Sequence, residues 1–197
     1  MNQKIRIKGL QKPLFLLYLK CMSEKVAVYP GSFNPVHPGH LHVIRQAAEL
    51  FDKVYVLVAE NPEKSYKVPA DVRASWLDKM TTGFYWKKNV IIDISSKSLV
   101  DYCKDHNVEF VVRGLRDGKD LDYEKVQAEY NYVLSDEPTK LKYVYFTTPA
   151  HAAHLSSSSV RQFIKYATFE KMVNLYFLGG WGSFPDAVKE IFDSYKE

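Results

Sequence analysis

The stretch from Val26 to Leu41 constrains the fold of this chain more than any other segment. It begins with an apolar run typical of a buried strand, continues through the pairs Pro30-Gly31 and Pro38-Gly39, and then enters an amphipathic helix. This order predicts a strand, a tight turn and a helix. The first N–H groups of a helix have no partner within the helix and carry partial positive charge, so they stabilise an anion. The sequence therefore predicts an anion site, suited to a phosphate group, at the start of this helix.

The rest of the chain alternates between strand-like and helix-like segments. The apolar runs typical of strands are Lys25–Tyr29, Lys53–Ala59, Val90–Ile94, Val108–Val112 and Leu141–Phe146. Amphipathic stretches separate most of them, and the clearest are His40–Phe51, Ser98–His106 and Tyr123–Leu134. This alternation predicts an α/β fold, a Rossmann-like five-stranded parallel sheet flanked by helices in a single domain. Ligands of such sheets bind beyond the carboxyl ends of the strands.

The two ends of the chain fall outside the predicted main domain, which we place at residues 25–177. Residues 1–24 form an N-terminal extension whose apolar run is too short for a membrane span and lacks a small-residue signal-peptide cleavage site. Because Met22 stands just before the first strand, we expect residues 1–21 to be a disordered, dispensable extension or a misassigned start. Residues 178–197 are predicted to form a loop and a last amphipathic helix over Pro185–Tyr195.

Charge and cysteine content exclude several function classes. The 197 residues include 27 basic and 23 acidic ones, a net charge of +4 that favours small anionic substrates over nucleic acid. The two cysteines, Cys21 and Cys103, form no C-x-x-C pair. We therefore expect no disulfide framework, no thiolate metal site and a cytoplasmic setting without membrane attachment. Neither a Walker A loop nor a G-x-G-x-x-G motif is present, which disfavours P-loop kinases and dinucleotide-binding domains.

Two histidines stand three residues apart in the segment His37-Pro38-Gly39-His40. A purely structural interpretation makes His37 a turn residue and His40 a helix cap. A zinc site is the least favoured alternative, because it would need H-E-x-x-H spacing and a third ligand. A nucleotide site is favoured because two Pro-Gly pairs bracket a loop that lets backbone approach a ligand closely, and Ser32 adds a hydroxyl.

Two arginines and a run of serines are further candidates for phosphate binding. Arg113 and Arg116 follow the run Glu109–Val112, at the carboxyl end of a predicted strand. Guanidinium forks match phosphate oxygens with paired hydrogen bonds, and a structural ion pair is the alternative. The serines Ser156–Ser159 precede an amphipathic run, where they are either ordinary helix caps or a phosphate cradle.

Three other residues carry a weaker signal on their own. Tyr123 and Glu124 start the predicted helix after these arginines, where the helix dipole favours acidic residues in any case. Lys64 follows the second strand in a loop, where a lysine is usually solvated surface. Lys64 would not be selected from residue type alone.

Taken in order, these motifs resemble the phosphopantetheine adenylyltransferase family of the nucleotidylyltransferase superfamily. The resemblance runs from about Lys25 to Phe177 and rests on Tyr29–Leu41 with its H-x-G-H segment, Asn61-Pro62-x-Lys64, Arg113–Arg116, Tyr123-Glu124, Asn131 and Leu155–Arg161. It implies the transfer of an adenylyl group from ATP to 4′-phosphopantetheine, giving dephospho-coenzyme A and pyrophosphate. It also implies Mg²⁺ bound through the ATP phosphates, no covalent enzyme intermediate, and a homohexamer or other homo-oligomer.

The resemblance assigns roles to residues of this chain. The family pattern implies a catalytic set of His40, Lys64, Ser32 and Arg113, in which His40 stabilises charge at the α-phosphate. It implies an ATP site made of Ser32, Phe33, His40, Gly114, Leu115, Arg116, Glu124, Ala152, Ala153, His154, Leu155, Ser156, Ser157 and Ser158. The acceptor would be bound by Ser32, Lys64, Leu99, Arg113 and Asn131.

Departures from the family pattern leave two alternatives open. Asn34 and His37 are more typical of nicotinate or nicotinamide mononucleotide adenylyltransferases, whereas Arg113–Arg116 and Tyr123-Glu124 favour the phosphopantetheine enzymes. Lys97 and Ser98 stand where the family typically has an acidic and an apolar residue. The second alternative is a non-catalytic nucleotide-binding homologue, which the full set of histidine, lysine and arginines disfavours, because binding alone does not need a residue at the α-phosphate.

Overall fold

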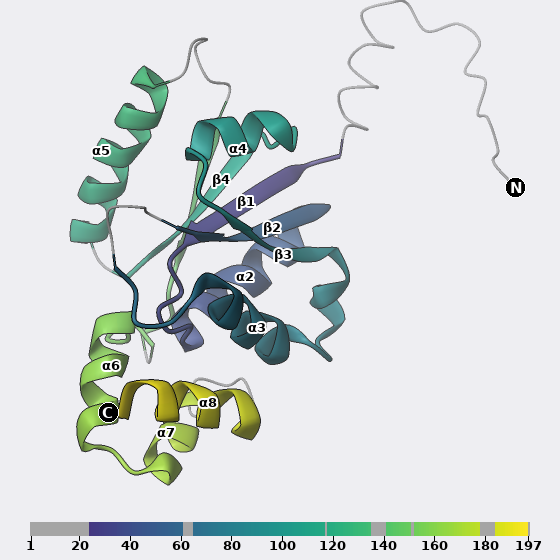
Figure 1. Ribbon diagram of the computed structural model, residues 1–197. Coiled ribbons are helices and arrows are strands. Elements are labelled where there is room, and N and C mark those ends of the chain that lie inside the picture. The colour runs from purple at the N-terminus through teal and green to yellow at the C-terminus, as the bar shows by residue number, and fades with distance from the viewer. Residues whose placement is uncertain are drawn as a thin grey trace, which may run out of the picture.

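The computed structural model of the protein describes residues 24–60, 65–116, 118–134, 141–150, 152–177 and 184–196. Five strands in these ranges form one parallel sheet, β1 (Val26–Gly31), β2 (Lys53–Ala59), β3 (Val90–Ser95), β4 (Phe110–Leu115) and β5 (Lys142–Thr147). Their order across the sheet is β3-β2-β1-β4-β5 (Figure 1). The predicted α/β fold with a five-stranded parallel sheet is confirmed.

The strand order reverses beside β1, which starts the sheet at its centre. β1 pairs with β2 on one side, where Val28 is opposite Tyr55, and with β4 on the other, where Val28 is opposite Val111. The connection from β1 to β2 and the connection from β4 to β5 therefore run in opposite directions across the sheet. A crevice opens outside the carboxyl ends of the strands at such a point, and this is where ligands bind in open α/β sheets.

Helices cover both faces of the sheet because successive strand residues point to opposite sides. On one face, α2 (Pro38–Leu50) and α3 (Ala70–Thr81) bury a core that includes Ala27 and Val56. On the other face, α4 (Leu99–Asp105) packs against Val28 and Val111. A short 3-10 helix, η1 (Tyr85–Asn89), precedes β3.

Three helices come from the C-terminal part of the chain, and we call them the C-terminal helices. They are α6 (Ser157–Tyr166), α7 (Phe169–Tyr176) and α8 (Pro185–Lys196), and they lie beyond the carboxyl ends of the strands (Figure 1). α8 contacts α3, α6 and α7. Side chains such as Ile164, Met172 and Ile191 join the main core. These helices therefore close the end of the sheet at which the anion site is predicted.

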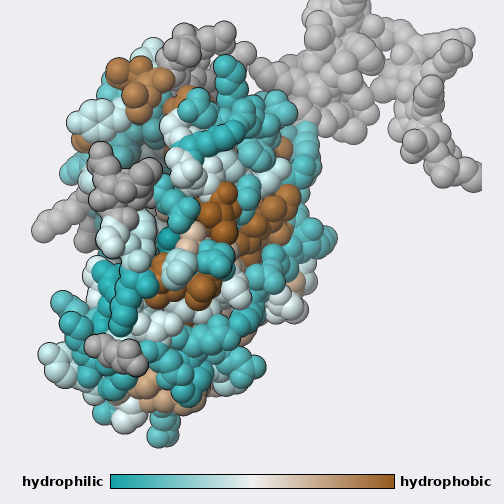
Figure 2. Space-filling model, viewed as in Figure 1, coloured by the Kyte–Doolittle hydropathy of each residue, from teal (hydrophilic) through white to brown (hydrophobic). Residues whose placement is uncertain are grey.

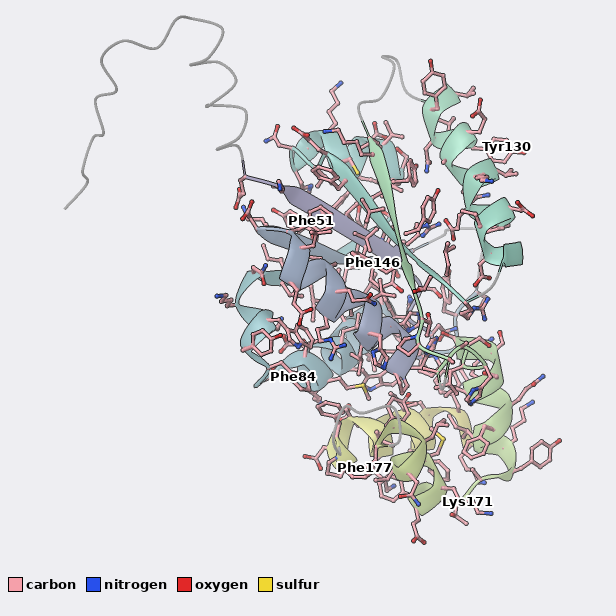
Figure 3. All side chains as sticks on the ribbon, turned by 180° about the vertical axis from the view of Figure 1, so that it is seen from behind. Phe51, Phe84, Tyr130, Phe146, Lys171 and Phe177 are labelled. Atoms are coloured by element: carbon pink, nitrogen blue, oxygen red, sulfur yellow. The ribbon has the colours of Figure 1, made fainter. Side chains whose placement is uncertain are left out.

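Helix α5 (Gly118–Val133) contacts β4 and leaves apolar side chains in solvent. Val126 is 50% exposed, Tyr130 60% and Val133 71%. Figure 2 shows apolar colour at the end of α5 beside the grey segment, and Figure 3 shows Tyr130 on the side of α5 away from the sheet. This outer face, defined by Tyr123, Val126, Tyr130, Val133 and Leu134, is an apolar stripe at helical spacing.

Some predicted boundaries are wrong. β4 extends to Leu115, so Arg113 and Gly114 lie within the strand rather than after it, because both pair with β5 opposite Tyr145 and Phe146. α5 begins at Gly118, not at Tyr123. Helices α3 and α7 were not predicted, and in α3 the buried face includes Arg73 and Thr81, which breaks the apolar stripe that would reveal it. Residues 1–23 and 178–183 lie outside the described residues.

The packing of α2 on β4 yields a first prediction. A Cβ atom added at Gly114 would lie 2.7 Å from Cγ2 of Val43, a buried and stiff side chain of α2, whereas one added at Gly118 meets nothing within 4 Å. Gly114→Ala should therefore lower the free energy of unfolding by about 1–3 kcal/mol. The matched variant Gly118→Ala should change it by less than about 0.5 kcal/mol.

Urea denaturation of both variants provides the measurement. Adding Val43→Ala to Gly114→Ala should recover part of the loss, because the smaller side chain removes the clash. Equal stabilities of Gly114→Ala and Gly118→Ala would show that α2 and β4 do not need a glycine at their contact.

Candidate functional site

A cavity of about 310 Å³ lies at the carboxyl ends of the central strands. It brings together seven of the predicted ATP-site residues, namely His40, Gly114, Arg116, Glu124, Leu155, Ser156 and Ser157. These residues come from α2, β4, α5 and the start of α6, which are far apart in the sequence. The cavity therefore lies at the predicted place, where the strand order reverses.

The start of α2 is held by hydrogen bonds that the rings of its two histidines accept from backbone N–H groups. Nδ1 of His37, the N-cap residue, accepts from the Gly39 N–H at 3.2 Å, and Nδ1 of His40 accepts from the His37 N–H at 3.2 Å. The two ring centroids are 3.8 Å apart. A Cβ atom at Gly39 would lie 2.9 Å from Cε1 of His37, so only glycine allows this close approach. The helix start is thus capped by imidazole rings rather than by hydroxyl or carboxylate groups.

These hydrogen bonds determine where each imidazole carries its proton. A neutral ring that accepts at Nδ1 must be protonated at Nε2. Burial lowers the pKa of His37 well below its usual value, with the charges of His40 and Arg116 acting in the same direction. Burial, and then the charge of Arg116, lower the pKa of His40 to about 3. His40 therefore lines the cavity as a neutral ring with an Nε2–H donor at neutral pH.

The two arginines occupy different places. Arg116 lines the cavity, and its Nε and Nη2 donate to the Asp120 carboxylate at 2.9 and 2.8 Å, while its backbone N–H donates to the same carboxylate. Arg113 lies outside the lining and pairs with Glu124, and its Nη1 donates to the Pro30 carbonyl at 3.1 Å. Both side chains thus form the ion pairs given as the alternative, and Arg116 also presents a positive charge to the cavity.

The serine run forms a helix cap that faces the same cavity. Ser156 is the N-cap of α6, where its Oγ accepts from the Ser159 N–H at 3.0 Å and Ser159 Oγ accepts from the Ser156 N–H at 2.8 Å. Leu155, Ser156 and Ser157 line the cavity. The starts of α2 and α6 therefore bring two positive dipole ends, together with Arg116, to one cavity, an arrangement that suits a polyanion.

Other predicted residues are not brought to the cavity wall. The Phe33 ring is 1% exposed and packs edge-on against His40 at 4.9 Å, so its side chain belongs to the core. Leu115 accepts the Thr148 N–H through its carbonyl at 2.8 Å, and Asn131 donates to the Tyr143 hydroxyl at 2.9 Å. Ser32, Leu99, Arg113, Ala152, Ala153, His154 and Ser158 are also absent from the lining. Lys64 lies outside the described residues.

Several lining residues were missed by sequence reasoning. Tyr29 and Thr148 stand at or just after the ends of β1 and β5, and the rule that ligands bind at carboxyl edges would have selected both. Val43 and Asp120 line the cavity from α2 and α5. Glu124 lies in the second turn of α5 rather than at its start, because that helix begins at Gly118. No sequence signal marks Val43, which looks like an ordinary core position.

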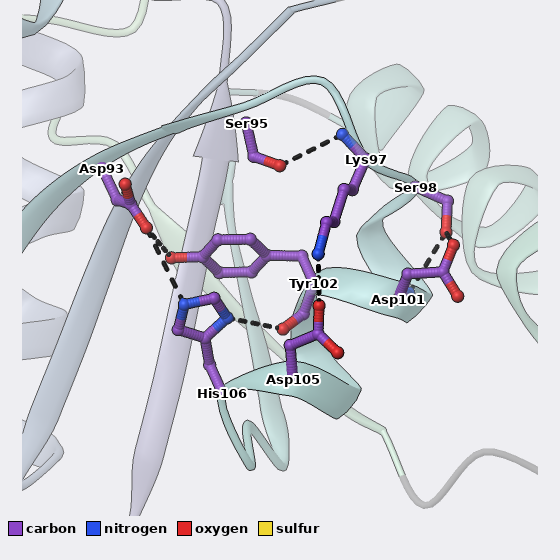
Figure 4. Close-up of polar contacts among 8 residues, drawn as sticks. All are labelled: Asp93, Ser95, Lys97, Ser98, Asp101, Tyr102, Asp105 and His106. Atoms are coloured by element: carbon purple, nitrogen blue, oxygen red, sulfur yellow. Dashed lines mark hydrogen bonds and ion pairs between the residues drawn. The ribbon is translucent and has the colours of Figure 1, made fainter.

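Lys97 and Ser98, the two departures beside α4, have local partners. The Lys97 ammonium contacts the Asp105 carboxylate at 2.6 Å (Figure 4). The Ser98 hydroxyl accepts the Asp101 N–H at 3.1 Å and so caps α4. Both side chains therefore serve the structure around α4 and lie away from the cavity wall.

The donor set at the cavity does not favour a protein-bound metal. Across the described part of the chain, no group of three His, Cys, Asp or Glu side chains is arranged to hold an ion. The two lining carboxylates, Asp120 and Glu124, are paired with arginines. No helix in the described ranges is long and apolar enough to cross a membrane.

Comparisons with known proteins agree in sequence and in fold. The family model described as Cytidylyltransferase-like matches residues 28–163. A phosphopantetheine adenylyltransferase of Leifsonia xyli subsp. xyli is 40% identical over 139 residues, which are 71% of this chain and 85% of that protein. Another, of Chromobacterium violaceum, is 32% identical over 166 residues, covering 77% of this chain and 98% of that protein.

One solved structure has a similar fold over most of this chain. The nicotinic acid mononucleotide adenylyltransferase of Plasmodium falciparum, complexed with NaAD, has a TM-score of 0.64 and 16% identity. The match covers 89% of this chain and 100% of that one. At this identity the likeness supports the fold alone.

The neutral histidine pair makes stability depend on pH. Both pKa values are lowered in the folded chain, so below about pH 6.5, the usual histidine pKa, the unfolded state binds more protons and the free energy of unfolding falls. Between pH 7 and 5.5 the loss is about 1.2 kcal/mol per histidine, or about 2.5 kcal/mol for the pair. His37→Asn, which keeps an acceptor at the N-cap, should halve this loss in urea denaturation.

An unchanged pH dependence in the His37→Asn variant would contradict the assignment of a buried neutral ring at this position. The free energies of unfolding of the variant and the native chain are compared at each pH, so that the contributions of other titrating groups cancel.

Proposed function

The chain belongs to the phosphopantetheine adenylyltransferases of the cytidylyltransferase-like family, and we propose that it transfers the adenylyl group of ATP to 4′-phosphopantetheine. An oxygen of the acceptor phosphate forms a bond to the α-phosphorus of ATP. The bond from that phosphorus to the oxygen bridging the β-phosphate breaks, and pyrophosphate leaves with the electron pair. The products are dephospho-coenzyme A and pyrophosphate, and no protein side chain forms a bond to phosphorus.

The observation that carries the proposal is the convergence of two helix starts and Arg116 on one cavity. The triphosphate of ATP is a polyanion, and the positive dipole ends at the starts of α2 and α6 stabilise its oxygens without moving. Asp120 holds the Arg116 guanidinium at the cavity before the nucleotide arrives. We assign ATP to the cavity residues and to the neighbouring loop from Ala152 to Ser158, as the family resemblance implies.

His40 supplies the catalytic hydrogen bond. Its Nε2–H donates to an oxygen of the α-phosphate, where negative charge increases as the acceptor attacks. A neutral donor in a protected site suits this role, because its strength comes from fixed geometry and does not require a change of protonation. Removing one such donor typically lowers kcat by about 100- to 1000-fold.

The acceptor assignment rests on the family resemblance. Ser32 and Lys64 would bind the acceptor phosphate, Arg113 and Asn131 would hold the phosphopantetheine, and Leu99 would contact the pantetheine arm. Arg113 does not line the cavity, but it forms an ion pair with Glu124, which does. The segment Asn34–His37 favours a pyridine mononucleotide as the alternative acceptor in the same reaction. We assign the protein to the cytoplasm, in agreement with its free Cys103.

Magnesium belongs to the substrate in this proposal. Mg²⁺ prefers oxygen ligands and usually keeps several waters, so it binds proteins mainly through substrate phosphates. The two carboxylates at the cavity are engaged by arginines, which leaves the ATP phosphates as the main ligands. The metal would neutralise the leaving pyrophosphate.

Self-association is proposed as well. The apolar stripe on α5, which includes Val126, Tyr130 and Val133, is exposed along one side of the helix. A stripe of this kind at helical spacing is typical of a helix with an apolar partner. We assign this partner to a second copy of the chain, in agreement with the homo-oligomer that the family resemblance implies.

The experiment that tests the function measures pyrophosphate release with MgATP and each of three acceptors, 4′-phosphopantetheine, nicotinate mononucleotide and nicotinamide mononucleotide. We expect release with 4′-phosphopantetheine alone. His40→Ala should lower kcat by at least about 100-fold while ATP affinity stays within about tenfold. His106→Ala is the matched control, because this histidine follows α4 and contacts Tyr102 and Asp93 outside the cavity.

Release with a pyridine mononucleotide alone would move the assignment to that acceptor. ATP binding without release in all three arms would leave a non-catalytic nucleotide-binding protein. Equal losses of turnover and ATP affinity in His40→Ala would remove the role given to His40.

A further inference from the structure

The loop between β1 and α2, residues Gly31–His37, is held from outside through its backbone carbonyls. The Pro35 carbonyl accepts from the Ser157 hydroxyl at 2.8 Å, and the Val36 carbonyl accepts from the Tyr176 hydroxyl at 2.6 Å. The Ser32 carbonyl accepts from Arg73, and the Asn34 carbonyl from Arg161. The donors come from α3, α6 and α7, so the C-terminal helices and α3 together set the path of this loop.

The last helix contacts the loop through a side chain. The Tyr195 hydroxyl, on α8, donates to Oδ1 of Asn34. Tyr195 is 7% exposed, and its ring lies 6.3 Å from that of Trp76 on α3. Burial raises the pKa of Tyr195 to about 12, so the hydroxyl keeps its proton at neutral pH. This hydrogen bond joins residues 161 positions apart in the sequence.

The residue beside Asn34 has a backbone conformation that needs such support. Phe33 has a φ of +46°, in the left-handed region that residues with a Cβ atom rarely occupy. Non-glycine residues keep this conformation when their surroundings determine it on several sides. Here the Ser32 and Asn34 carbonyls and the Asn34 side chain are all held, so the Phe33 backbone is fixed between them.

The Phe33 ring transmits this conformation to the catalytic histidine. It is 1% exposed and packs edge-on against the His40 ring, with centroids 4.9 Å apart. Its far end lies against Gly31, where an added Cβ would meet the ring at 3.1 Å. A shift of the Phe33 backbone would therefore move the surface on which the His40 ring rests.

We propose that Tyr195 is a positioning residue for adenylyl transfer, which acts by holding Asn34 and, through the Phe33 backbone, the ring of His40. This inference rests on the proposed function. It gives the C-terminal helix α8 a part in the reaction although Tyr195 does not line the cavity. A misplacement of about 1 Å can lower a rate by about 100-fold when reacting groups must be aligned.

The test is a double-mutant cycle measured by pyrophosphate release with MgATP and 4′-phosphopantetheine. Tyr195→Phe removes the hydroxyl and keeps the ring that packs against Trp76, and Asn34→Ala removes the acceptor. Ser194→Ala is the control on the same helix, since its hydroxyl donates to the Glu190 carbonyl at 2.7 Å within α8. The free energy of unfolding of each variant is measured by urea denaturation, to separate folding from turnover.

We expect Tyr195→Phe to lower kcat by about tenfold or more, with the KM for ATP within about threefold, and Ser194→Ala to match the native chain. In the Asn34→Ala background, Tyr195→Phe should have little further effect, because the two residues act through one hydrogen bond. If Tyr195 had only a structural role, Tyr195→Phe would lower the free energy of unfolding, and its effect on kcat would not depend on Asn34.

Two results would overturn the proposal. One is a kcat of Tyr195→Phe within about twofold of the native value in an active enzyme, which leaves the proposed function intact. The other is a cycle in which the two losses multiply, as they do for independent sites. If the native chain releases no pyrophosphate with any acceptor, the proposed function fails, and the role of Tyr195 fails with it.

Discussion

The rest of the site depends on the hydrogen bonds that the His37 and His40 rings accept from backbone N–H groups at the start of α2. A helix N-terminus next to an anion site presents the positive end of its dipole to the ligand, and a charged carboxylate cap would repel that ligand. Two neutral imidazoles satisfy the first N–H groups without adding negative charge. The same bonds leave the Nε2–H of His40 as a donor in the cavity. The ring that caps the helix therefore also carries the donor that we propose for catalysis.

This helix start is placed by packing on both of its sides. Gly114 allows Val43 of α2 to approach β4 closely, which brings the helix over the centre of the sheet. On the other side, Arg73, Arg161, Tyr176 and Tyr195 hold the Gly31–His37 loop from α3 and the C-terminal helices. The strand order adds the third part, since the reversal beside β1 brings the ends of β4 and α5 to the same crevice. Long-range contacts thus build a site whose central motif is local in sequence.

The local parts of this arrangement were accessible from the sequence, and the long-range parts were not. The strand, the Pro-Gly turns and the helix with two histidines are encoded within 16 consecutive residues, Val26–Leu41, so hydrophobic period and turn chemistry predicted them. The end of β4 was misplaced because Arg113 and Gly114 pair through their backbones, which residue type does not reveal. Tyr195 looks like an ordinary residue of an amphipathic helix, and Arg73 lies in a segment where no helix was predicted. Only the fold brings both side chains to the Gly31–His37 loop. The role of Lys64 at the site stays a prediction.

The most direct measurement is ¹⁵N NMR of the His40 imidazole at pH 7, in the native chain and with MgATP bound. We expect a neutral ring protonated at Nε2 in both states, with the Nε2–H resonance shifted by the nucleotide and Nδ1 still an acceptor of the His37 N–H. A ring protonated at Nδ1, an imidazolium, or a His40 spectrum unchanged by MgATP would contradict the role of this histidine as the neutral donor to the α-phosphate.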